Sequence, residues 1–220
     1  VETKSRTAIG HTRWATHGEP NLKNCHPHSF AKVTLIHNGI IENYREIAGM
    51  LESEEIYPQS ETDTEIAALL IGSRYKGNPL KTLQNCLPLF DGSYAFCILF
   101  HDRLGEIYVA RMGSPLVVSQ CSDGAIVSSD ILGTISYSKT YFPMPEKSIA
   151  RLTSESVQLY DYKGRALTPE WEEVHWDIEG AKKQGYEYYM QKEIHEEPEA
   201  LKNTLRQAPD VILMGESRDR

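Results

Sequence analysis

The centre of the chain contains the run Tyr94-Ala95-Phe96-Cys97-Ile98-Leu99-Phe100, which is short, apolar and rich in residues that favour β-strands. Five similar runs follow it, separated by turn sequences that contain Gly, Pro or Asp. They cover residues 106–111, 116–119, 125–128, 149–152 and 157–162. Short strands joined by tight turns predict antiparallel sheets in this half of the chain.

The half of the chain before this run has helical spacing instead. Apolar residues recur every three or four positions over residues 41–53, which predicts an amphipathic helix. The capping-box sequence Thr62-Asp63-Thr64-Glu65 predicts the start of a second helix, and Asn78-Pro79 predicts the start of a third. Residues 7–11 and 32–37 are predicted strands, and residues 188–205 are helical in pattern. Strands grouped apart from helices predict an α+β fold in which helices cover layered sheets.

The composition narrows the function classes. The chain has 220 residues, 40% of them hydrophobic and 25% charged, which is typical of a globular protein with a substantial core. Its formal charge of −8 argues against binding to nucleic acid, which requires a basic patch. No apolar run approaches the roughly 20 residues of a membrane span, so no membrane partner is expected. The four cysteines lack paired CxxC spacing, which indicates reduced thiols and a cytoplasmic location.

Three polar clusters lie at predicted ends of strands or helices, and each has two interpretations. Arg13 beside Trp14 could clamp a carboxylate, or could stack on the indole as a structural pair. His37-Asn38-Gly39 could offer two donors to an oxyanion, or could be a simple turn. In residues 60–65, Asp63 could pair with a ligand ammonium, or the segment could only cap a helix. From the residues alone, both interpretations of each cluster stay open.

The segment Cys25-His26-Pro27-His28 admits two further interpretations. Its two histidines are a candidate metal pair, although no Cys or carboxylate nearby completes a zinc ligand set. Cys25 beside His26 is a candidate thiol–imidazole nucleophile, although no local third group orients the imidazole. A metal-binding module is therefore the weakest function class that the sequence supports.

Taken together, the polar clusters resemble one enzyme family. It is the glutaminase domain of class II glutamine amidotransferases, in the form found in glutamine–fructose-6-phosphate aminotransferases (isomerizing). The resembling strings are residues 11–21, 37–44 and 60–65, followed by residues 91–95, 111–116, 128–130, 189–194 and 196–198. The resemblance extends from about residue 7 to residue 205.

The resemblance implies a fold and an activity. The fold is the four-layer αββα sandwich of N-terminal nucleophile hydrolases, with two antiparallel sheets, here lacking its first strand. Residues 1–207 would form the amidotransferase domain, and residues 208–220 would begin a linker to a sugar isomerase domain that the sequence does not contain. The activity is hydrolysis of glutamine to glutamate and ammonia, for synthesis of glucosamine 6-phosphate from fructose 6-phosphate. The implied partners are glutamine and, through the isomerase domain, fructose 6-phosphate. No cofactor or metal is implied, and the whole enzyme is expected to be a homo-oligomer.

The resemblance also implies roles for individual residues. Arg13 would hold the glutamine α-carboxylate, and Asp63 would hold the α-ammonium. Asn38 and Gly39 would form the oxyanion hole. The pocket would be shaped by Trp14, Thr16 and His17. The family nucleophile is an N-terminal cysteine, whereas this sequence begins with Val1. The chain as given is therefore expected to be an N-terminally truncated fragment that releases no ammonia by itself. The alternative is a non-catalytic homologue that binds glutamine as a sensor or scaffold. Residues 139–146 carry no function that the sequence indicates.

Overall fold

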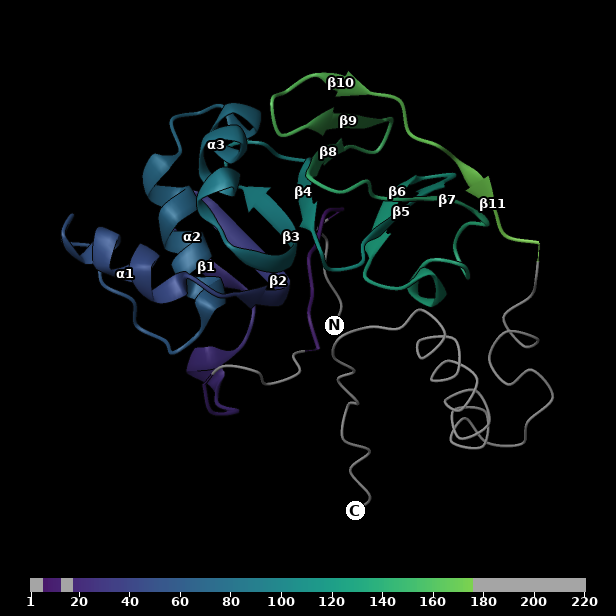
Figure 1. Cartoon of the computed structure of the whole chain (residues 1–220). Coiled ribbons are helices and arrows are strands. Elements are labelled where there is room, and N and C mark those ends of the chain that lie inside the picture. The colour runs from purple at the N-terminus through teal and green to yellow at the C-terminus, as the bar shows by residue number, and fades with distance from the viewer. Residues whose placement is uncertain (1–5, 13–17, 176–220) are drawn as a thin grey trace, which may run out of the picture. The chain divides into compact units, whose positions relative to one another are not determined.

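The computed structural model describes residues 6–12 and 18–175 (Figure 1). The helices of this part are η1 (Leu22–Asn24), α1 (Tyr44–Glu52), α2 (Asp63–Arg74), α3 (Pro79–Cys86), η2 (Leu87–Leu89) and η3 (Ile131–Gly133), where η marks a single 3-10 turn. Its strands are β1 (His28–Phe30), β2 (Val33–Ile41), β3 (Gly92–Phe100), β4 (Ile107–Met112), β5 (Val117–Cys121), β6 (Gly124–Ser128), β7 (Thr140–Pro143), β8 (Ser148–Leu152), β9 (Val157–Asp161), β10 (Ala166–Leu167) and β11 (Glu172–Glu173). None of the described helices is long and apolar enough to cross a membrane.

The strands form two antiparallel sheets, as predicted. The larger sheet has the order β1-β2-β3-β4-β8-β9-β10, and the smaller has the order β11-β7-β5-β6. Strand β2 pairs with β3 along its whole length, from Val33 to Ile41. Strand β1, in contrast, pairs with β2 only as far as Leu35. Beyond Leu35, one edge of β2 is therefore not covered by β1, and the candidate site lies along this edge.

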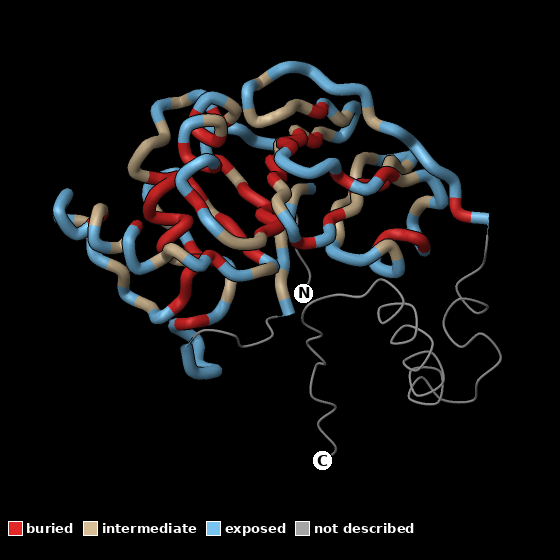
Figure 2. The backbone as a smooth tube through the Cα atoms, in the orientation of Figure 1, coloured by how far each residue is buried: buried red, intermediate tan, exposed pale blue. Residues whose placement is uncertain are grey.

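The larger sheet separates two apolar cores. One face packs against α1, α2 and α3, and Leu35 belongs to this core. The opposite face packs against the smaller sheet, and Ile36 belongs to that second core. Figure 2 shows the buried residues concentrated in the helices and in the central strands between them and the smaller sheet. Successive side chains of a strand point to opposite faces. His37 is accordingly directed to the helical layer, and Asn38 is directed toward the smaller sheet.

The predicted starts of two helices are confirmed. Thr62 Oγ1 accepts the N–H of Glu65 at 3.2 Å as the N-cap of α2. Asn78 Oδ1 accepts the N–H of Lys81 at 3.0 Å as the N-cap of α3. The helix predicted over residues 41–53 begins later, at the start of α1, because β2 continues to residue 41. Among the described residues, the helices and the two sheets form three layers of the predicted αββα sandwich.

Two parts of the fold differ from the sequence-based prediction. Residues 7–11 do not form the predicted strand, because β-forming side chains make a strand only beside a hydrogen-bonding neighbour and no described strand pairs with them. Residues 139–146, which carried no clear pattern, contain β7. This strand pairs with β5, and the N–H of the buried Met144 donates to the carbonyl of Leu116 at 2.8 Å. The helix predicted over residues 188–205 and the linker over residues 208–220 lie outside the described residues.

Candidate functional site

Three of the predicted site residues lie in the described part of the chain, and they gather around β2. Asn38 and Gly39 belong to β2 itself, and Asp63 is the first residue of α2, which packs against that strand. The other four, namely Arg13, Trp14, Thr16 and His17, lie outside the described residues.

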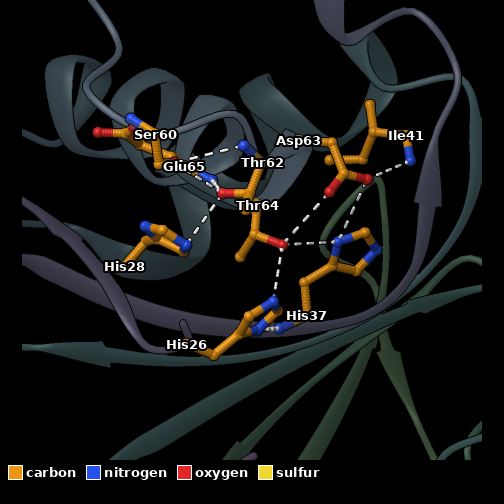
Figure 3. A network of polar contacts seen from close by, with 9 residues as sticks. All are labelled: His26, His28, His37, Ile41, Ser60, Thr62, Asp63, Thr64 and Glu65. Carbon is orange, nitrogen blue, oxygen red and sulfur yellow. Dashed lines mark hydrogen bonds and ion pairs between the residues drawn. The ribbon is translucent and has the colours of Figure 1, made fainter. Parts of the chain in front are cut away.

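The edge of β2 that β1 leaves uncovered is lined by backbone amides. The N–H of His37 donates to Nδ1 of His26 at 3.2 Å, and the N–H of Ile41 donates to Oδ2 of Asp63 at 2.9 Å (Figure 3). Along a strand, the N–H groups of alternate residues point to the same edge. The N–H of Gly39 is therefore directed to this edge, between the two observed bonds. The same edge of β2 therefore carries a backbone donor at Gly39 and a bound carboxylate at Ile41.

The carboxylate of Asp63 is buried, and polar groups surround one side of it. Its Oδ1 lies 3.5 Å from the hydroxyl of Thr64, at the limit of a hydrogen bond. Its Oδ2 lies 3.7 Å from Nδ1 of His37, whose side chain is also buried. A carboxylate taken out of water needs hydrogen-bond donors or a counter-charge. Ile41 and Thr64 supply such donors and fix the orientation of the carboxylate.

The backbone around Gly39 requires glycine. Its φ of +131° lies in a region that residues with a Cβ rarely adopt. A Cβ at this position would overlap the carbonyl oxygen of Ser93 and would lie 2.7 Å from the hydroxyl of Ser114. Arg111 holds the loop that contains Ser114, because its Nε donates to the Ser114 carbonyl at 2.7 Å and its guanidinium pairs with Glu146 at 3.0 Å. Gly39 thus lies in a tightly enclosed section of β2.

Asn38, on the opposite face of β2, lines a cavity of about 400 Å³ between the two sheets. His11 and Thr12 line the same cavity and directly precede Arg13 in the sequence. The cavity therefore brings Asn38 together with the residues that precede Arg13 in the sequence. A larger cavity of about 740 Å³, bordered by residues 6–8 and by turns of both sheets, contains none of the predicted site residues. The smaller cavity and the adjacent edge of β2 are therefore the candidate site.

The described cysteines are all free and none resembles an activated nucleophile. Burial raises the pKa of Cys97, which lines the smaller cavity, to about 12. Burial raises the pKa of Cys86 to about 11, and it also raises the pKa of Cys121. Since the thiolate is the reactive form, these thiols are unreactive near neutral pH. The exposed Cys25 donates its S–H to the carbonyl of Asn21 at 3.2 Å.

The two histidines considered as metal ligands bind threonine hydroxyls at the N-terminal end of α2. Nε2 of His28 lies 2.9 Å from Oγ1 of Thr62, and Nε2 of His26 lies 3.3 Å from Oγ1 of Thr64. Within residues 6–12 and 18–175, no group of three or more His, Cys, Asp or Glu side chains is arranged to hold a metal ion. The metal-binding interpretation therefore finds no support in the described part of the chain.

Glu65 anchors the loop that leads into α2. Its carboxylate accepts the N–H groups of Gln59 and Ser60, whereas a capping box would direct it to the backbone of Thr62. Burial acts to raise the pKa of Glu65, but the hydrogen bonds from Ser60 and Gln59, together with nearby His28, outweigh burial and lower it. The charged form of Glu65 is therefore favoured in the folded protein.

Two neighbours of the site, His37 and Thr64, belong to clusters that the sequence indicated, but the sequence assigned them no role of their own at the site. The strand period could have indicated His37, because it shares the alternation of the buried residues Val33 and Leu35. No local signal identifies the hydroxyl of Thr64, because a threonine in the first turn of a helix has many ordinary reasons to be there.

Two solved structures share this arrangement of sheets and helices. Glutamine phosphoribosylpyrophosphate amidotransferase from B. subtilis, in complex with ADP and GMP, aligns with a TM-score of 0.60 and 23% identity over 71% of this chain and 35% of its own. An allosteric regulatory enzyme of purine biosynthesis aligns with a TM-score of 0.53, 23% identity and 59% coverage of this chain, against 28% of its own. At these identities the likeness concerns the fold alone.

The sequence comparison identifies the family. The model of the glutamine amidotransferase domain family matches residues 19–132, and the chain belongs to this family. Similar curated proteins include the glutamine–fructose-6-phosphate aminotransferases (isomerizing) of Caldanaerobacter subterraneus subsp. tengcongensis, 42% identical over 200 residues, and of Clostridium acetobutylicum, 38% identical over 199 residues. Each alignment covers 90% of this chain but only 33% of the relative, so the chain spans about a third of the length of these relatives.

Proposed function

We propose that this chain binds L-glutamine and supports hydrolysis of its side-chain amide to glutamate and ammonia. The observation that carries the proposal is the hydrogen bond from Ile41 that fixes the carboxylate of Asp63 at the edge of β2. Strand alternation directs the N–H of Gly39 to the same edge. Membership of the glutamine amidotransferase domain family and the cavity beside Asn38 support the same conclusion.

The proposal assigns one end of the substrate to charge recognition. An α-amino acid carries an ammonium and a carboxylate on one carbon, so it requires an anionic and a cationic partner. Asp63 is the anionic partner, and its bond from Ile41 holds the carboxylate in a fixed orientation. Arg13 is the cationic partner, because a guanidinium binds a carboxylate through two parallel hydrogen bonds. Trp14, Thr16 and His17 complete the walls of the pocket.

The other end of the substrate is where the chemistry occurs. When a nucleophile adds to the amide carbon, the carbonyl oxygen becomes an oxyanion, and donors that are already in place stabilise it. The N–H of Gly39 and the side-chain amide of Asn38 are these donors. Overall, water adds across the C–N bond, ammonia leaves and glutamate remains.

Calorimetric titration with L-glutamine tests the recognition step. Asp63→Asn keeps an oxygen that can accept from Ile41 and removes only the charge, so we expect the dissociation constant for L-glutamine to rise about 10- to 100-fold. Asp123→Asn, the same change in an exposed turn between β5 and β6, serves as the matched control and should leave binding unchanged. D-glutamine is the stereochemical control for the ligand.

The outcomes separate the candidate functions. No binding of L-glutamine, or equal binding by the Asp63→Asn variant, would refute the assignment. Binding together with ammonia release by the protein that carries this sequence supports the hydrolase. Binding without ammonia release would instead indicate a glutamine sensor or scaffold.

We further infer that the ammonia is transferred to fructose 6-phosphate, which the names of the relatives identify as their acceptor. Formation of glucosamine 6-phosphate from fructose 6-phosphate, with L-glutamine or ammonium as the nitrogen source, tests this step in the protein that carries this sequence. A homo-oligomer in the cytoplasm is the expected setting, and light scattering and cell fractionation test these two points. In this proposal residues 1–207 form the amidotransferase domain and residues 208–220 begin the linker to the acceptor domain.

A further inference from the structure

The imidazole of His26 contacts three separate segments of the chain. Its Nδ1 accepts the backbone N–H of His37 on β2 at 3.2 Å. Its Nε2 lies 3.3 Å from the hydroxyl of Thr64 on α2. One face of the ring stacks on His11, with ring centroids 4.3 Å apart and planes 15° from parallel. Figure 3 shows the imidazole between β2 and the first turn of α2.

Each of the three contacts involves a residue that lies within two sequence positions of one that the proposed function assigns to glutamine. His11 lies two positions before Arg13 in the sequence, His37 directly precedes Asn38, and Thr64 directly follows Asp63. In the sequence, the contacted residues are therefore near neighbours of the proposed carboxylate clamp, oxyanion donors and ammonium site.

The hydrogen bonds define the tautomer of His26. Because Nδ1 accepts a backbone N–H, it carries no proton, and the neutral ring therefore carries its proton on Nε2 and donates it to Thr64. The Thr64 hydroxyl has two lone pairs and one hydrogen. It can accept from His26 and from Nδ1 of His37, 3.3 Å away, while donating to Oδ1 of Asp63. This assignment follows from the pattern of donors and acceptors, and it gives a directed chain from His26 to the carboxylate.

The imidazole of His26 also supplies a hydrogen-bond acceptor where β2 has no paired strand on this edge. At His37, the edge of β2 has passed the last residue paired with β1, so the ladder supplies no partner there from that side. His26 supplies this acceptor from its side chain. It therefore fixes the peptide that leads into Asn38 and Gly39, and displacing donors in a pocket of this kind by about 1 Å can reduce activity about 100-fold.

We infer that His26 is a positioning residue for the glutamine site, holding the three glutamine-binding segments in register through His11, His37 and Thr64. The inference rests on the proposed function. It assigns His26 no contact with the reacting atoms, and it replaces the earlier interpretations of His26 as a metal ligand or as the partner of a Cys25 nucleophile.

Three substitutions each remove a different set of the His26 contacts. His26→Asn places an amide oxygen near the position of Nδ1 and so keeps an acceptor for His37. His26→Phe keeps a ring that can stack on His11 and removes both polar contacts. Thr64→Val keeps the shape of the side chain and removes the hydroxyl. His101, an exposed residue just after β3 whose ring bonds the Thr34 hydroxyl at 2.8 Å, provides matched His→Asn and His→Phe controls.

The dissociation constant for L-glutamine, measured by calorimetry, is the main readout, and the urea midpoint of unfolding is measured in parallel. Losing two hydrogen bonds predicts that His26→Phe weakens binding about 5- to 100-fold, while His26→Asn weakens it less than about fivefold. The His101 variants should bind within about twofold of the unsubstituted protein. The double variant His26→Phe/Thr64→Val should weaken binding by less than the product of the two single effects, because both substitutions break the same bond.

The outcomes are distinguishable from those of the proposed function. If the unsubstituted protein does not bind L-glutamine, the proposed function fails and this inference fails with it. If L-glutamine binds and His26→Phe binds it equally well, the positioning role alone is refuted. Should His26→Phe not fold, His26→Asn and Thr64→Val decide: retained binding in the first with weakened binding in the second supports the inference, and the reverse overturns it.

Discussion

Replacing Gly39 by alanine should destabilise the protein substantially, because two costs act at the same position. At φ +131° a residue with a Cβ is strained, at a cost of about 1–3 kcal/mol. The new Cβ would also overlap the carbonyl oxygen of Ser93 and crowd the hydroxyl of Ser114 at 2.7 Å, which forces a backbone shift that costs about 1–3 kcal/mol more. We therefore expect Gly39→Ala to lower the free energy of unfolding by about 2–6 kcal/mol.

Gly49 provides the matched control. It lies inside α1, is exposed, and has open space where a Cβ would be. Alanine is the better helix former, so Gly49→Ala should raise the free energy of unfolding by about 0.5–1 kcal/mol. The same chemical change should thus have opposite signs at the two positions.

Urea unfolding measures both effects. Helical circular dichroism reports on α1–α3. Tryptophan fluorescence includes the signal of Trp171, whose ring lies edge-on to Phe142 at 4.8 Å beside the smaller sheet. The difference between the two variants should appear in both signals. If Gly39→Ala unfolded at the same urea concentration as the unsubstituted protein, the backbone of β2 would not have the conformation described, and the argument for a tightly enclosed site would fail.

Three further predictions concern the site and its support. Arg13→Ala should lower kcat/KM for L-glutamine, raising the corresponding activation free energy by about 2–4 kcal/mol, and should leave the reaction with free ammonia intact. Equal loss of both reactions would indicate a folding role. Asn38→Ala should lower kcat about 10²–10³-fold with KM for glutamine nearly unchanged, and a change in KM alone would contradict an oxyanion role. Glu65→Gln should lower the free energy of unfolding at pH 7 by about 1 kcal/mol. Because folding lowers the pKa of Glu65, its contribution is present above the unfolded value near 4.5 and is lost as the pH falls through the folded value. The difference between the two proteins in urea unfolding should therefore shrink as the pH falls below about 4.5, and a constant difference would refute the charged anchor.

The sequence predicted those parts of the fold that depend on local chemistry. The N-caps Thr62 and Asn78 were identifiable because a side chain that caps a helix bonds an N–H three residues away. The strands after residue 93 were identifiable because each turn sequence directly follows one strand and precedes the next. In both cases the signal and the structure lie within a few residues of each other.

The parts that the sequence did not predict depend on distant partners. Strand β7 forms because β5 and Leu116 offer hydrogen-bonding groups to residues whose own pattern indicates no strand. Residues 7–11 have β-forming side chains but no described strand pairs with them. Glu65 has the spacing of a capping box, yet Gln59 and Ser60 provide donors that compete for its carboxylate.

The candidate site also combines features that the local sequence indicated with features that depend on distant partners. Residue types indicated Asn38, Gly39 and Asp63 as candidates, but no spacing in the sequence could show that β1 ends its pairing at Leu35. That end point exposes the amides of β2, and each exposed amide then needs a partner that is not a strand. His26 and Asp63 serve as two such partners, at His37 and Ile41, and they flank the N–H of Gly39. A strand that remained paired along this edge would use the same N–H for the sheet and could not offer it to an oxyanion. Because β1 begins only at His28, opposite Leu35, the rest of this edge of β2 is left open for the binding role that we propose.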